Sequence, residues 1–191
     1  MKVTFYYDIV CPFAYLASTQ IEQVCAGAEL VWQPILLGGL LKSIGNPEPM
    51  RAAPPAKAHM NLLDAQRWAE HRGVPLVFPP GHPRRTVEAM RLCTSLTDRR
   101  AQVSHALYRA YWVEGADVSD PNVLARIAGG PVALEGAKDA LRTATDAAAA
   151  QGVFGVPSMR VETDDGKSYL FWGQDRLEFV SKVLAGWRPK A

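Results

Sequence analysis

Residues 5–17, FYYDIVCPFAYLA, place a strand, a cysteine and the start of a helix in direct succession. The strand is predicted over residues 2–7, which are rich in β-branched and aromatic residues. Pro12 suits the first turn of a helix, where its missing N–H forfeits no hydrogen bond. Apolar residues then recur at helical spacing as far as Val24. Cys11 is therefore expected at a strand-to-helix turn.

A second strand is predicted over residues 30–37, where apolar residues predominate and Pro34 favours an edge position or a strand end. The chain thus opens with strand, helix and strand, as many α/β folds do. Residues 38–55 contain repeated glycine and proline and are expected to form a loop.

The middle of the chain, from about residue 56 to residue 150, is dominated by helical patterns. In one predicted helix, apolar residues repeat from Val103 at i, i+4, i+7 and i+8, which is typical of a helix face packed on a core. Asp120 followed by proline is typical of a helix start. The helices are expected at about 56–71, 84–96, 99–113, 120–128 and 133–151.

Strand patterns return after residue 152. Strands are predicted over 158–162 and 168–172, joined by a hairpin turn at Asp165-Gly166, and Asp175 opens a final helix. The order βαβ, helices, ββα predicts the α/β class: a thioredoxin-like fold with an all-helical domain inserted between the βαβ and ββα halves. The expected bounds are 1–40 with 151–191 for the thioredoxin-like domain, and 41–150 for the inserted helical domain.

Composition narrows the functional classes. The chain has 191 residues and a net charge of +2, which is too close to neutral for a nucleic-acid-binding or anionic membrane-binding surface. We find neither a signal peptide nor the roughly 18 consecutive apolar residues of a membrane helix. The three cysteines form no CxxC pair and no metal-ligand spacing. A reducing, cytoplasmic setting and no metal site are the expectations.

Cys11 is the candidate for chemistry. A cysteine directly before a helix lies near unpaired N–H groups and the positive end of the helix dipole, so the sequence predicts a lowered thiol pKa. A buried structural role is the alternative reading. Cys25 and Cys93 fall within helical patterns beside apolar residues and are expected in the core.

Further short stretches run collinear with residues 5–17 to the end of the chain: 44–46 (IGN), 64–69 (DAQRWA), 73–79 (GVPLVFP), 153–159 (VFGVPSM) and 172–177 (WGQDRL). On these residues the chain resembles the 2-hydroxychromene-2-carboxylate isomerases and the kappa-class glutathione transferases, within the DsbA-like group. Asp64, Arg67 and Trp68 belong to these stretches, and we interpret them as packing and ion-pair residues.

The resemblance implies glutathione as cofactor, a small aromatic substrate and a homodimer. It places Val156 before a cis-proline, where its backbone would pair with the cysteinyl residue of glutathione. Asp175 suits the γ-glutamyl end, since a carboxylate can pair with an ammonium. The expected glutathione-binding residues are Asn46, Lys57, Val156, Pro157, Gln174 and Asp175, beside the catalytic Cys11.

The implied reaction is a glutathione-dependent cis–trans isomerisation. The family usually has a serine where this chain has Cys11, so two roles stay open: a protonated thiol that donates a hydrogen bond to the glutathione sulfur, or a nucleophile. The second role would make the protein a DsbA-like or kappa-class thiol oxidoreductase or transferase that uses Cys11 as a monothiol. A module that only sequesters a thiol ligand is a third hypothesis.

Overall fold

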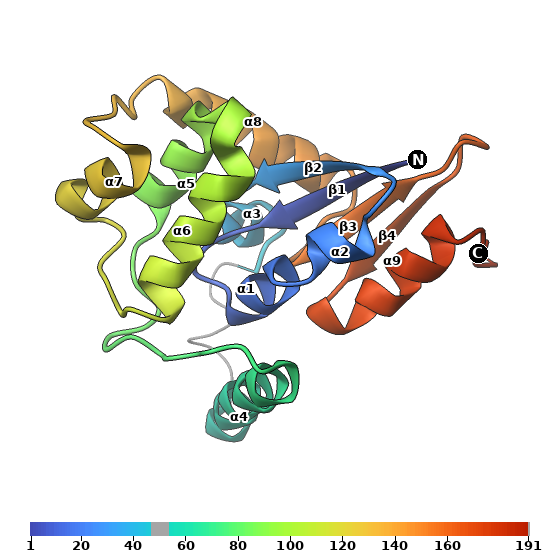
Figure 1. Ribbon diagram of the computed structural model, residues 1–191, viewed down its shortest axis with the longest axis horizontal. Helices are drawn as coiled ribbons and strands as arrows, with labels where there is room; N and C mark the ends of the chain where they lie inside the picture. The colour runs from blue at the N-terminus through green and yellow to red at the C-terminus, as the bar shows by residue number, and fades with distance from the viewer. Residues whose placement is uncertain (47–53, 191) are drawn as a thin grey trace.

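A mixed four-stranded sheet forms the centre of the computed structural model, which describes residues 1–46 and 54–190 (Figure 1). The strand order is β2-β1-β3-β4. β1 and β2 are parallel, whereas β3 runs antiparallel to both β1 and β4. The strands are β1 (Lys2–Tyr7), β2 (Glu29–Pro34), β3 (Ser158–Glu162) and β4 (Ser168–Trp172). This arrangement confirms the thioredoxin-like α/β fold.

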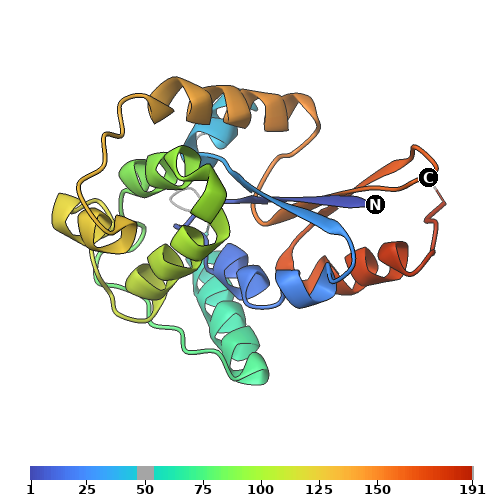
Figure 2. The same ribbon diagram turned by 45° about the horizontal axis from the view of Figure 1, so that its top comes forward.

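Helices cover both faces of the sheet (Figure 2). α1 (Pro12–Ser18), α2 (Ile21–Val24) and α9 (Leu177–Leu184) lie on one face, and α9 follows a 3₁₀ turn at Gln174–Arg176. On the other face α8 packs against α3 and β2. The helices between β2 and β3 are α3 (Leu37–Ser43), α4 (Pro55–Arg72), α5 (Val87–Ser95), α6 (Arg100–Trp112), α7 (Pro121–Ala128) and α8 (Ala137–Ala150), with a 3₁₀ turn at Thr97–Arg99.

The predicted elements of the chain's middle are confirmed within a few residues at their ends. α4 ends at Gly73, which adopts a left-handed φ of 64° that glycine accepts without strain. Asp120 caps α7, since its carboxylate accepts a hydrogen bond from the Asn122 N–H at 2.8 Å. The α6 stripe that begins at Val103 is buried, as expected.

One buried cluster joins the sheet to the helices that follow β2. Phe5 and Tyr7 of β1 belong to it together with Tyr108 and Trp112 of α6. The Tyr7 hydroxyl shares a 2.6 Å hydrogen bond with Ser104. Thus α6 packs on the same core as β1, and the division into two domains at residues 40/41 and 150/151 stays a prediction.

The single helix expected from Pro12 to Val24 is wrong, because the structure has two short helices with a break at Thr19-Gln20. Two groups satisfy the carbonyl of Leu16 at this break: Thr19 Oγ1 donates to it at 2.8 Å and Arg72 Nη1 at 2.9 Å. These bonds replace the helical N–H partners that a continuous helix would supply.

The expectation of a loop over residues 38–55 is wrong at its start, where α3 forms and β2 ends at Pro34 instead of continuing to residue 37. The N–H groups at the start of α3 bond to side chains that are distant in sequence: Leu37 N donates to Asp8 Oδ2 at 2.9 Å, and the N–H of the N-cap residue Leu36 donates to Thr145 Oγ1 at 3.0 Å. Burial of Leu40 against this framework stabilises the helix.

No helix within 1–46 and 54–190 has the length and apolar character needed to cross a membrane. The same ranges contain no cluster of three or more histidine, cysteine or acidic side chains with the arrangement of a metal site.

Candidate active site

Cys11 lies at the N-cap of α1, where the sheet brings the end of β1 next to the start of β3. Its carbonyl accepts hydrogen bonds from the N–H groups of Ala14 and Tyr15 at 3.1 and 3.0 Å. Its Sγ donates to the carbonyl of Val156 at 3.2 Å. The side chain is only 8% exposed. The predicted strand-to-helix position of Cys11 is therefore confirmed.

The expected lowering of the thiol pKa is wrong for this structure. Burial in a site of low polarity disfavours the thiolate and raises the pKa of Cys11 to about 12. The N–H groups of Ala14 and Phe13 oppose this shift, whereas the negative charge of Asp8 adds to it. The helix start is thus present, but desolvation outweighs it. At neutral pH Cys11 is a protonated thiol that donates a hydrogen bond.

Alkylation of Cys11 is expected to be slow and to keep accelerating above pH 9. Only the thiolate reacts, and at pH 8 a thiol with a pKa of about 12 is ionised about 1,000-fold less than one with the ordinary value of 9.0. Iodoacetamide labelling of the Cys11 peptide, followed by mass spectrometry from pH 6 to 11, measures this. The urea-unfolded chain is the control, with all three cysteines reactive. A rate that levels off near pH 7 would contradict the prediction.

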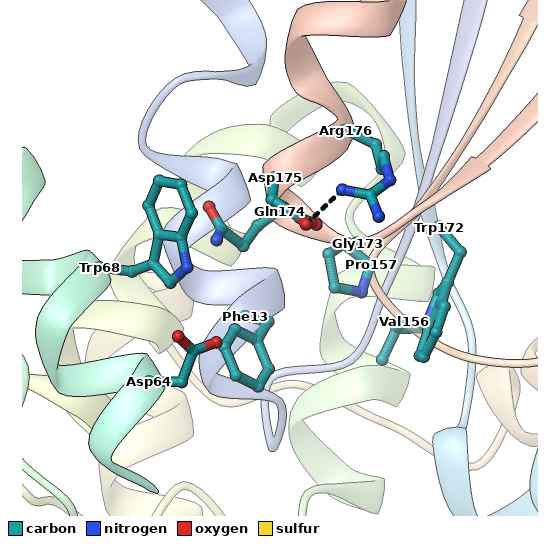
Figure 3. Close-up of a pocket in the computed structure, with 10 residues that line it drawn as sticks. All are labelled: Phe13, Asp64, Trp68, Val156, Pro157, Trp172, Gly173, Gln174, Asp175 and Arg176. Carbon is teal, nitrogen blue, oxygen red and sulfur yellow. Dashed lines mark hydrogen bonds and ion pairs between the residues drawn. The ribbon is translucent and has the colours of Figure 1, made fainter. Parts of the chain in front are cut away.

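A cavity of about 250 Å³ opens beside Val156, the residue whose carbonyl accepts the Cys11 thiol (Figure 3). It combines α1, α4, the segment before β3 and the segment that follows β4. Its lining residues are Phe13, Asp64, Trp68, Val156, Pro157, Trp172, Gly173, Gln174, Asp175 and Arg176.

The cavity unites four of the residues that the resemblance singled out: Val156, Pro157, Gln174 and Asp175. The peptide bond before Pro157 is cis. Asn46 and Lys57 are exposed and are not among the lining residues. The cavity therefore combines Val156 and Pro157, which lie next to Cys11, with Gln174 and Asp175, which follow β4. Asn46 and Lys57 are not part of its wall.

Gln174 is one of the polar residues that line the cavity. Its side chain is 2% exposed, yet its Oε1 atom accepts no hydrogen bond from any residue that the structure describes. Asp175, the next residue, pairs with Arg176 and is exposed. A buried amide oxygen without a donor costs about 1–3 kcal/mol, and a ligand with an N–H or ammonium group would remove this cost.

Arg72 holds this turn in place, a role that the sequence did not reveal. Its Nη2 donates to the carbonyl of Gln174 at 3.2 Å, while its Nη1 bonds to Leu16 of α1. Its guanidinium also lies 5.1 Å from the ring centre of Trp68. Arg72 therefore connects α4, α1 and the turn that carries Gln174.

Asp64 and Trp68 line the cavity. Trp68 packs against Arg72 and His71, as the packing interpretation expects, whereas the ion-pair interpretation is wrong for Asp64. Asp64 forms no ion pair with any residue in 1–46 or 54–190, and Arg67 is exposed. The i, i+4 spacing of Asp64 and Trp68 places both on one face of α4. That spacing within a stretch that resembles a known family was the available signal. Phe13 and Trp172 also belong to the stretches that resemble the family, but nothing in the sequence pattern predicted that they line the cavity.

Comparisons with known proteins agree with this architecture. The model of the DSBA-like thioredoxin domain matches residues 2–131 and 132–185. A 2-hydroxychromene-2-carboxylate isomerase of Sphingobium xenophagum is 29% identical, with 95% of this chain and 97% of the relative covered. Glutathione S-transferase kappa 1 of Rattus norvegicus is also 29% identical, with 94% and 88% covered. A solved 2-hydroxychromene-2-carboxylate isomerase superposes with a TM-score of 0.78 at 25% identity, with 97% of this chain and 95% of that chain covered.

Proposed function

The chain belongs to the DSBA-like thioredoxin domain family, and from this premise we propose that it is a glutathione-dependent isomerase of the 2-hydroxychromene-2-carboxylate type. Its relatives include isomerases of that name and kappa-class glutathione transferases, so enzymatic activity in this group is supported. Beyond this, we propose glutathione as the cofactor and cis–trans isomerisation as the reaction.

The observation that carries the proposal is the buried Oε1 of Gln174, which accepts no hydrogen bond within the described residues, next to the Asp175 carboxylate. Two acceptors at one end of a cavity suit the ammonium of a γ-glutamyl group. Val156 also lines the cavity, and its carbonyl accepts the hydrogen bond of the Cys11 thiol at 3.2 Å. The cavity thus suits a ligand that carries an ammonium group and, near Val156, a sulfur atom.

Glutathione, when bound, would supply a thiolate for reversible addition to the substrate: with the hemiketal ring open and the conjugated carbonyl accepting the π electrons, the former C=C bond would be free to rotate before the thiolate leaves. The residues of the chain bind and orient glutathione for this reaction. Gln174 and Asp175 bind the ammonium end, and the Val156 backbone aligns the cysteinyl residue. Cys11 keeps its proton at neutral pH because burial raises its pKa to about 12. Its S–H group can then turn from the Val156 carbonyl to the ligand sulfur and donate a hydrogen bond.

The test is isomerisation of 2-hydroxychromene-2-carboxylate by the wild type, Cys11→Ser and Cys11→Ala, with and without glutathione. A hydroxyl is a stronger donor than a thiol, so Cys11→Ser is expected to match or exceed the wild type. Cys11→Ala is expected to lose about 10-fold or more, since a hydrogen bond to a charged group is worth about 1.5–3 kcal/mol. Turnover that is equal without glutathione would contradict the proposal.

A monothiol oxidoreductase is the second candidate, and the position of Cys11 at a helix start beside Val156 favours it. Here the Cys11 thiolate would attack oxidised glutathione, forming a mixed disulfide and releasing one reduced glutathione. The raised pKa of Cys11 opposes this route. Incubation with oxidised glutathione and intact mass measurement separates the two: a stable glutathionyl adduct at Cys11, combined with no isomerase activity, would select the oxidoreductase.

A further inference from the structure

Two large aromatic side chains are half exposed here: one lines the cavity and the other packs against it. Trp172, the last residue of β4, is 52% exposed, and Phe154, in the segment before β3, is 48% exposed. Their rings contact each other with centroids 4.9 Å apart and planes tilted by 54°. Apolar surface exposed next to a cavity is typical of a ligand-binding wall.

The backbone fixes the place of Trp172. It lies opposite Ser158 in the β3–β4 register, and the next N–H, that of Gly173, donates to the carbonyl of Pro157 at 2.9 Å. The indole also packs onto Gly155, where an added Cβ would lie 2.7 Å from the indole Nε1. The ring can therefore occupy this position only because residue 155 has no side chain.

Trp172 lies beside Val156 and Pro157, whereas Trp68 lies on the opposite side of the cavity (Figure 3). Val156 is the residue that contacts the Cys11 thiol. A group attached to a sulfur near Cys11 would thus emerge close to the indole. A flat conjugated group gains about 0.5–1.5 kcal/mol from aromatic stacking beyond the area that it buries.

We propose that Trp172, supported by Phe154 and accommodated by Gly155, is the wall on which the flat aromatic group of the second substrate stacks. This inference rests on the proposed glutathione site and assigns the side chains that select the acceptor. Gln174 and Asp175 then recognise the cofactor, and Trp172 recognises the group that the cofactor's sulfur meets.

Binding of two non-reactive conjugates tests this without requiring turnover. Isothermal titration calorimetry with S-methylglutathione and S-(1-naphthylmethyl)glutathione measures the affinity that the aromatic group adds. The wild type is expected to bind the naphthylmethyl conjugate at least about 10-fold more tightly. Trp172→Leu should reduce that advantage about 5-fold or more while the Kd of S-methylglutathione stays within about twofold. Trp172→Phe should retain most of the advantage.

Gly155→Ala is the second variant, since it keeps the indole but forces it to move, and it should reduce the aromatic advantage as Trp172→Leu does. Trp187→Leu is the matched control: Trp187 is 43% exposed and packs on Phe179, and it does not line the cavity. An unchanged advantage in Trp172→Leu, or an equal loss for both conjugates, would overturn the assignment. Absence of S-methylglutathione binding in the wild type would instead overturn the proposed function itself.

Discussion

Asp8→Ala is expected to lower the free energy of unfolding by about 3–5 kcal/mol at neutral pH, because each buried donor left without an acceptor costs about 1–3 kcal/mol and the lost side chain leaves a cavity. Asp8 is 1% exposed. It accepts hydrogen bonds from Leu37 N and Thr86 Oγ1, each at 2.9 Å, and from Val10 N at 3.2 Å. Alanine would leave these donors without their acceptor and create a cavity.

Urea unfolding followed by circular dichroism measures this effect. Asp146→Ala is the control, because Asp146 is an exposed residue of α8 and its loss should change stability by less than about 0.5 kcal/mol. A stability for Asp8→Ala within about 1 kcal/mol of the wild type would show that the three donors find other acceptors.

The pH dependence of this effect has a definite sign. Burial raises the pKa of Asp8 above its ordinary value of 3.8, although the Leu37, Val10 and Thr86 donors oppose the shift. A raised folded-state pKa contributes stability that is fully present below pH 3.8 and is lost as the pH rises through the folded-state pKa. The advantage of the wild type over Asp8→Asn should therefore be larger at pH 3.5 than at pH 7.

Local sequence patterns predicted the strands and the position of Cys11, because these features depend on residues that are adjacent in the chain. Strand formers before Cys11 and a proline after it define a strand-to-helix turn without further information. The start of α3 could not be predicted in this way, since its N–H groups bond to Asp8 and Thr145, which are 29 and 109 residues away from their donors. A helix cap that is supplied by a distant side chain cannot be recognised from the local sequence.

In the candidate site, too, some features could be predicted from the sequence and others could not. The order of strands brings the segment with Val156 next to Cys11, so that part of the site followed from the topology. The pKa of Cys11 did not follow, because the helix N-terminus is a local feature whereas desolvation depends on everything packed around the thiol. Trp172 occupies the cavity wall through its contact with Gly155, a pairing across two segments that neither segment indicates alone.

Gly173→Ala is expected to weaken glutathione binding about 10- to 100-fold. Gly173 has a φ of 110°, which costs a residue with a side chain about 1–3 kcal/mol. An added Cβ would also lie 2.5 Å from Asp175 Oδ1, so the carboxylate that we assign to the γ-glutamyl ammonium would have to move. Both effects act on the turn that carries Gln174. Calorimetric titration with glutathione measures the loss.

Gly166→Ala distinguishes backbone strain from displacement of the Asp175 carboxylate. Gly166 has a φ of 78° with nothing within 4 Å of an added Cβ, and it lies in the β3–β4 hairpin turn, so alanine there is strained in the backbone without a contact. It should cost stability yet leave the Kd of glutathione within about twofold. Asp175→Ala, which leaves the backbone of Gly173 intact, should reproduce the binding loss. If Gly173→Ala binds glutathione as the wild type does, Asp175 is not a ligand of the ammonium, and Gln174 alone must recognise that end.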